Sequence, residues 1–168
     1  MISLRKLSTV AAAVMTFITA AAFLTGCSDG GMELVLSDAD SGQVYASYPV
    51  EYGDTYAVEF VHSVNKSPVR DVFEIRDGEI WNTQCIYYGF GAGVEEELGE
   101  GETLSYGENG EMIISNIEKR MDNLIIVVGT ISDHTLYLGD ETISLRDLCG
   151  RSSQVLFTCE SGRSKKDR

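Results

Sequence analysis

Short runs in which apolar and polar residues alternate follow one another along most of the chain. The clearest example is Val58–Ile75 (VEFVHSVNKSPVRDVFEI), where apolar side chains recur at every second position on both sides of a short loop. A period of two is typical of strands with one buried face. The loop spans Asn65–Pro68, and Pro68 has no backbone N–H to donate to a neighbouring strand. The pattern therefore predicts an antiparallel hairpin at the centre of the fold.

Further runs of this kind predict about ten short strands, joined by turns rich in Gly, Asn and Asp. The step Asp77-Gly78 between two alternating runs is a strong hairpin signal. Asn116–Asn123 is expected to form a short surface helix, and the apolar run Leu124–Thr130 a central strand buried on both faces. Leu145–Cys149 fits one helical turn. Residues 32–160 are therefore expected to form one all-β domain, either an antiparallel sandwich or a partly closed barrel.

The alternation in the central hairpin also predicts a strand register. If Val64 pairs with Val69, His62 lies directly opposite Asp71, on the face that carries the aromatic residues. An imidazole and a carboxyl on an apolar face are expected to satisfy each other. Such a pair is able to orient a general base, line a binding site or simply fix the register. Ser67, in the loop, is a further candidate beside them.

A glycine-rich segment, Gly89–Gly93, interrupts the strand pattern. Gly91 and Gly93 are candidates for close backbone approach to a ligand, although the phosphate-binding spacings GxxxxGK[ST] and GxGxxG are absent. The acidic run Glu95–Glu102 is expected to be a solvated loop rather than a calcium site, because it lacks the EF-hand pattern. The sequence also lacks the HExxH and CxxC spacings that are typical of zinc sites. We therefore expect no metal and no cofactor.

The N-terminal residues have the three-part layout of an export signal. Arg5 and Lys6 precede an uncharged apolar run that ends in small residues before Cys27. A transmembrane anchor is the alternative. The ending Leu24–Cys27 resembles the bacterial lipobox, whose cysteine is lipidated and becomes the first residue. Residues 1–26 are thus expected to be a lipoprotein signal peptide, and residues 27–31 a lipidated tether that anchors the protein on the extracytoplasmic side of the cell membrane.

The charge of the chain excludes one large class of partners. With 26 acidic and 13 basic side chains, the formal net charge is −13. A protein that binds the phosphate backbone needs clustered Lys and Arg, so nucleic acid is not an expected partner. The basic residues 161–168 are expected to form a flexible tail.

Three further cysteines follow Cys27. An exported location permits a disulfide, and Cys149 and Cys159 are the closest pair in the sequence. An odd number leaves at least one thiol free or paired between chains. A Cys149–Cys159 disulfide and free thiols are both compatible with the sequence.

Two motifs carry a family resemblance. The first comprises residues 62–64 and 67–69, Asp71 and Phe73, and the second comprises residues 88–94. Together they resemble an uncharacterised bacterial domain-of-unknown-function family of small exported proteins, often encoded beside TAXI-type TRAP transporters. The likeness extends over Met32–Leu145. It implies a β-rich accessory protein linked to solute uptake.

These observations favour a membrane-tethered, non-catalytic binding or accessory module. Its expected partners are membrane lipid through Cys27 and a TRAP-type transporter or its solute. Two alternatives remain: a hydrolase-like enzyme that uses His62, and an envelope lipoprotein in which His62 and Asp71 only hold the register.

Overall fold

The computed structural model describes residues 31–64, 66–88 and 98–161. These residues form eleven strands and one short helix. In chain order they are β1 (Met32–Asp38), β2 (Val44–Val50), β3 (Thr55–Val61), β4 (Pro68–Arg76), β5 (Glu79–Tyr87), β6 (Thr103–Tyr106), β7 (Met112–Arg120), β8 (Leu124–Val127), β9 (His134–Leu138), β10 (Glu141–Ser144), α1 (Leu145–Cys149) and β11 (Gln154–Ser161).

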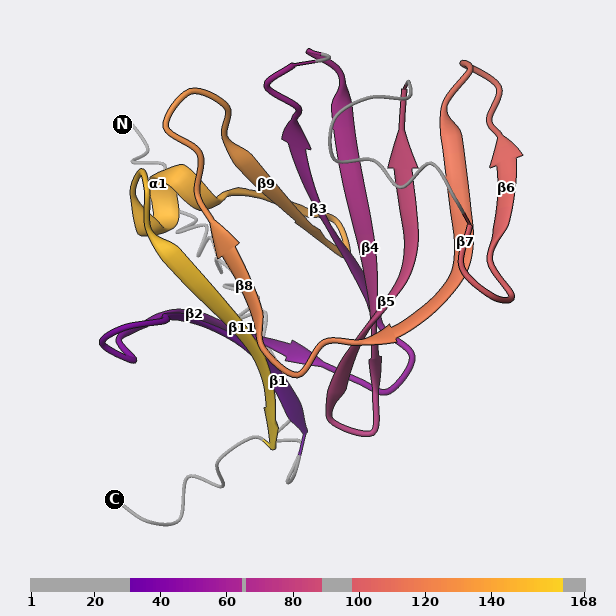
Figure 1. Cartoon of the computed structure of the whole chain (residues 1–168). Coiled ribbons are helices and arrows are strands. Elements are labelled where there is room, and N and C mark those ends of the chain that lie inside the picture. The colour runs from indigo at the N-terminus through magenta and orange to yellow at the C-terminus, as the bar shows by residue number, and fades with distance from the viewer. Residues whose placement is uncertain (1–30, 65, 89–97, 162–168) are drawn as a thin grey trace, which may run out of the picture.

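The strands form two antiparallel sheets that pack face to face (Figure 1). The smaller sheet has the order β2-β1-β11-β8, and the larger has the order β10-β9-β3-β4-β5-β7-β6. Neither sheet closes on itself within the described residues. The all-β prediction is confirmed, and of its two forms the fold is the sandwich.

Three aromatic rings join the two sheets at the centre of the core. Tyr56 on β3 stacks on Phe73 of β4, with 5.1 Å between ring centroids, and on Phe157 of β11, at 6.0 Å. Aliphatic side chains from both sheets surround them, including Leu34 and Ile75, which are fully buried. Burying each such side chain contributes about 1.5–3 kcal/mol. The alternation read from the sequence is therefore the pattern that fills the space between the sheets.

The turn between β4 and β5 has the geometry that its sequence predicts. Asp77 and Gly78 both have positive φ, at 51° and 79°. Two consecutive residues in this region make the two-residue hairpin turn whose twist matches that of the strands. The short helix α1 also agrees with its prediction. The side chain of Ser144 accepts a hydrogen bond from the Asp147 N–H, and Gly150, with φ 91°, follows the last turn.

The predicted surface helix at Asn116–Asn123 is wrong, because strand β7 continues through most of it. Asn116 and Glu118 adopt positive φ, at 61° and 51°, and the register between β5 and β7 shifts beside them. Such a bulge adds residues to one strand without ending the pairing. The bulge disturbs the alternation of polar and apolar residues, so the sequence did not read as a strand.

The apolar run that starts at Leu124 is not a central strand. β8 covers only Leu124–Val127 and is an edge of the smaller sheet, where its described pairing partner is β11. Ile125 and Val127 are exposed, at 45% and 57%. The prediction failed because a continuous apolar run does not by itself distinguish burial on two faces from an apolar sheet edge.

Candidate functional site

The inner face of the larger sheet carries two adjacent rows of cross-strand neighbours. They are Val58, Asp71, Cys85 and Ile114 in the first row, and Phe60, Val69, Tyr87 and Met112 in the second. Each row takes one residue from each of β3, β4, β5 and β7, because directly paired residues share a face. All these side chains are apolar, aromatic or sulfur-containing except one, so Asp71 is the single carboxyl within the two rows.

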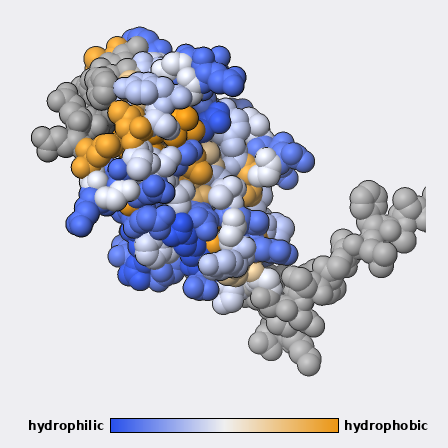
Figure 2. Space-filling model, turned by 90° about the vertical axis from the view of Figure 1, so that its right-hand side faces the viewer, coloured by the Kyte–Doolittle hydropathy of each residue, from blue (hydrophilic) through white to orange (hydrophobic). Residues whose placement is uncertain are grey.

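The smaller sheet covers only part of this inner face. A crevice lined by Asp71, Phe73 and Leu124–Val127 lies where β8 packs over β3 and β4. Beyond β8, the buried residues Val69, Tyr87, Met112 and Ile114 of these rows form a second apolar cluster. Figure 2 views the molecule from the side of β6 and β7 and shows hydrophobic side chains gathered in its upper half.

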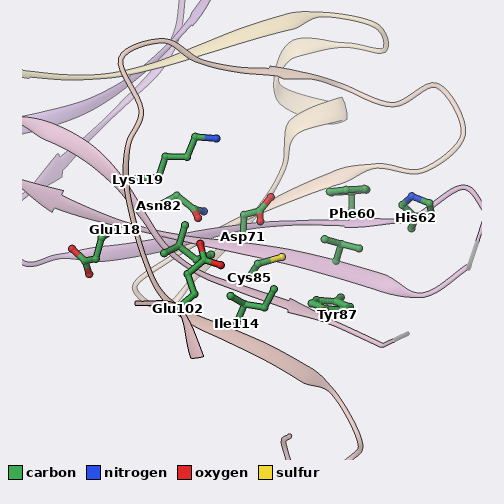
Figure 3. A pocket seen from close by; sticks show the side chains of 12 residues that line it. Phe60, His62, Asp71, Asn82, Cys85, Tyr87, Glu102, Ile114, Glu118 and Lys119 are labelled. Atoms are coloured by element: carbon green, nitrogen blue, oxygen red, sulfur yellow. The ribbon is translucent and has the colours of Figure 1, made fainter. Parts of the chain in front are cut away.

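Over this second cluster lies an open groove of about 570 Å³. Figure 3 shows how its walls are arranged, with Asp71 and Cys85 between two different ends. One end is aromatic and holds Phe60 and Tyr87, and the other is polar and holds Asn82 and Lys119. The remaining lining residues are His62, Val69, Glu102, Ile114, Ile117 and Glu118. This volume is in the range of pockets that bind small organic molecules.

The carboxyl of Asp71 lies in an apolar setting. Burial raises the pKa of Asp71, and a hydrogen bond from the Cys85 thiol acts in the opposite direction. Asp71 takes part in none of the ion pairs found among the described residues. The groove therefore presents an acid whose charge is only weakly compensated by the described protein neighbours.

The other charged groups of the groove are placed differently. Glu118 forms an ion pair with Arg76, and the Glu102 carboxylate accepts a hydrogen bond from the Gly99 N–H at 2.8 Å. Lys119 is exposed and forms no ion pair within the described part of the chain. Among the acids of the groove, Asp71 is thus the one for which the described residues supply no charged or backbone donor.

The predicted register of the central hairpin is wrong. Val58, not His62, is opposite Asp71, and Phe60 is opposite Val69, so the pairing is displaced by four residues. The physical reason is the position of the loop, which lies two residues closer to the N-terminus than predicted: the His62 N–H donates to the Ser67 carbonyl at 2.9 Å, and Pro68 is already the first residue of β4. Because the displacement is even, His62 and Asp71 keep the same face and both line the groove.

The distance between His62 and Asp71 follows from this register. Four strand positions correspond to about 13 Å along the sheet. His62 lies beyond Phe60 at the aromatic end of the groove, well away from Asp71 (Figure 3). The imidazole–carboxyl pair expected from the sequence is therefore not formed.

The other candidates from the sequence are spread over several places. Ser67 closes the hairpin loop through its carbonyl and does not line the groove. Gly91 and Gly93 lie outside the described residues, as do the signal segment, Cys27 with the tether up to residue 30, the residue Asn65 and the basic tail from residue 162. Among the described residues no group of His, Cys, Asp and Glu is arranged to hold a metal ion. No helix in those ranges has the length and hydrophobicity of a membrane span.

The described cysteines form no disulfide with one another. The structure therefore does not contain the Cys149–Cys159 disulfide that the sequence permitted. Cys149 ends α1, whereas Cys159 pairs with Leu34 in the middle of the smaller sheet. Burial raises the pKa of the Cys149 thiol to about 11. Closeness in the sequence did not predict a disulfide, because Cys149 lies at the end of α1 and Cys159 lies within β11.

Several residues that line the groove are not among the candidate site residues that the sequence predicts. The alternation of β5 does place Cys85 and Tyr87 on one face, and this was the available signal. Ile117 and Lys119 belong to the stretch that was read as a helix, so their position on the inner face of a strand was not foreseen.

The fold and the groove define the class of this molecule: an antiparallel β-sandwich whose larger sheet carries a partly acidic, partly aromatic groove. The model of the family described as Domain of unknown function (DUF1850) matches residues 56–145, more than half of the chain. The chain therefore belongs to the DUF1850 family. No curated protein and no solved structure gives a significant match.

Proposed function

We propose that this chain is a lipid-anchored, extracytoplasmic module that binds a small solute and assists a TRAP-type transporter. The observation that carries the binding role is the open groove with Asp71 in its floor. A carboxyl among apolar side chains costs free energy unless it is compensated. Such shifted groups in clefts are characteristic of functional sites.

Binding is favoured over catalysis by the separation of His62 from Asp71. A general base oriented by an acid requires the two groups within hydrogen-bond distance. Here the register separates them by four strand positions. A His62-dependent hydrolase therefore lacks the orienting carboxyl on which that alternative was based.

The anchoring role is supported by the lipobox-like sequence at Cys27 and by the position of the first strand. β1 begins at Met32, and five residues span at most about 17 Å. Met32 pairs with Ser161 at one end of the smaller sheet (Figure 1). A lipid on Cys27 would hold this end of the sandwich close to the bilayer and leave the groove of the larger sheet facing the aqueous phase.

Metabolic labelling with an alkyne-tagged fatty acid tests the anchor. We expect label and membrane association for the full chain and for Cys85→Ser, and loss of both for Cys27→Ser. A Cys27→Ser variant that keeps the label, or a mature protein that retains residues 1–26, would refute the anchor.

Thermal unfolding with a panel of small solutes tests the binding role. A ligand at about 100 times its Kd stabilises the folded state by about 2.7 kcal/mol. Ile117→Trp should fill the groove and abolish the shift, whereas Val44→Trp, on the exposed part of β2, should preserve it. Uptake by cells that express a TRAP-type transporter should also increase with the wild-type chain and not with Ile117→Trp. Equal ligand shifts in both tryptophan variants would refute the groove as the site.

A further inference from the structure

The charge distribution in the groove indicates where a ligand's charge would be placed. Glu118 and Glu102 are already engaged, by Arg76 and by the Gly99 N–H. Asp71 has the Cys85 thiol as its described hydrogen-bond partner and no ion pair among the described residues. A positively charged donor placed beside Asp71 would supply the compensation that its described protein neighbours do not.

The side chains beside Asp71 indicate the chemistry of the uncharged part of the ligand. Towards the aromatic end, Phe60, Val69 and Tyr87 form a continuous row two residues further along the strands. Apolar groups gain free energy there by burial, and aromatic rings also attract cations. An apolar tail therefore fits between Asp71 and Phe60.

At the opposite end of the groove, Lys119 limits the number of positive charges that a ligand can carry. It lines the groove beside Asn82, its cross-strand neighbour (Figure 3). A second positive charge on the ligand would lie against this ammonium group, and like charges at short range are unfavourable. The groove is thus suited to one cation and not to a polyamine.

We propose that the groove binds small organic monoamines, with the ammonium group at Asp71 and the apolar part over Val69 and Phe60. This inference rests on the proposed binding function and names the ligand class for the same site. The net charge of −13 acts in the same direction, because it raises the local concentration of cations and lowers that of anions.

Phenethylamine, 2-phenylethanol and 3-phenylpropionate form a matched set of probes with the same ring and different charge. The full chain in lipid nanodiscs, with ¹³C-methyl-labelled isoleucine, reports binding site by site. Ile114 and Ile117 line the groove, and Ile143 on β10 is the internal control against partition of the probes into lipid. We expect saturable shifts of the Ile114 and Ile117 methyl signals with the amine only.

Variants then separate charge recognition from folding. Asp71→Asn should weaken amine binding at least tenfold, while Asp40→Asn, which removes an exposed acid from the β1–β2 turn, should leave it unchanged. Lys119→Gln should bind the amine equally or a few-fold more tightly. Preference for the carboxylate or the alcohol, or amine binding that survives Asp71→Asn, would overturn the ligand class and leave the groove as a binding site. Failure of these probes and of every solute in the panel would overturn the proposed function itself.

Discussion

Asp71 on β4 and Cys85 on β5 are cross-strand neighbours, and the thiol of Cys85 donates a hydrogen bond to the carboxyl of Asp71. The thiol is a weak and uncharged donor. It therefore offsets only part of the cost of burying the carboxyl, and the pKa of Asp71 remains raised. Two predictions about acidity and stability follow from this pair.

The first prediction concerns the pH dependence of stability. Because burial raises the pKa of Asp71 above its unfolded value, the folded state binds this proton more tightly than the unfolded state. The contribution of Asp71 to stability is therefore most favourable at low pH and is lost as the pH rises through the folded pKa. Asp71→Asn removes this titration. We expect the variant to melt a few degrees above the wild type at pH 7.5, with the difference shrinking towards pH 3.5.

Thermal melts of both proteins across this pH range provide the measurement. Asp40→Asn, in the exposed turn after β1, is the control for the general loss of one negative charge. A difference that grows on acidification would mean that Asp71 is stabilised, not destabilised, in its ionised form.

The second prediction isolates the thiol. Cys85→Ala removes the donor that lowers the pKa of Asp71 while the burial that raises it remains. The pKa of Asp71 should therefore rise further. An NMR titration of ¹³C-labelled aspartate carboxyls measures it directly, and Cys159→Ala, in the smaller sheet, should leave the Asp71 titration in place. An unchanged or lower Asp71 pKa in Cys85→Ala would show that the thiol does not stabilise the carboxylate.

Sequence periodicity predicted the fold class because one buried face per strand is a local property. The turn at Asp77-Gly78 was equally predictable, since its positive φ values suit residues such as Gly and Asp. The register of the central hairpin depends on where its loop lies along the chain, and periodicity does not determine that position. A displacement by four residues keeps every side chain on its face. For this reason the prediction that His62 and Asp71 share a face is correct, and the prediction that they lie directly opposite each other is wrong.

The bulge in β7 shows a second limit. Positive φ at Asn116 and Glu118 occurs where the register between β7 and β5 shifts, and β5 is distant in the sequence. The local polar sequence NIEKRMDN therefore predicts a helix, whereas in the fold most of this stretch belongs to the bulged strand β7. Because Lys119 follows this bulge, the polar end of the groove could be found only from the tertiary structure.

The third prediction addresses the junction of the two sheets. The Tyr56 hydroxyl is buried without a hydrogen-bond partner among the described residues, and burial holds the pKa of Tyr56 well above its usual range. An unsatisfied buried polar group costs about 1–3 kcal/mol. Tyr56→Phe keeps both ring stacks and removes this group, so we expect equal or higher stability.

Tyr56→Ala should instead lose about 3–5 kcal/mol, because it leaves a cavity between Phe73 and Phe157. Urea denaturation of both variants measures the difference. Marked destabilisation by Tyr56→Phe would indicate that the hydroxyl is satisfied in solution.

The fourth prediction concerns Ser144, which connects β10 to α1. Its hydroxyl accepts from the Asp147 N–H at 3.0 Å and donates to the carboxylate of Asp133. Asp133 also accepts from the Arg146 N–H at 3.0 Å, so a single hydroxyl links the helix start to the loop before β9. Ser144→Ala should lower the free energy of unfolding by about 1–2 kcal/mol.

Urea denaturation again provides the measurement, with two matched variants. Ser144→Thr retains an oxygen for both hydrogen bonds and should keep most of the stability. Ser105→Ala, on the exposed edge strand β6, should change it by less than about 0.5 kcal/mol. Ser144→Asp should separate the two bonds: it still caps the Asp147 N–H but places a second carboxylate beside Asp133. We therefore expect Ser144→Asp to be destabilised at pH 7 and to recover on acidification, and wild-type stability at pH 7 would show that the bond to Asp133 contributes nothing.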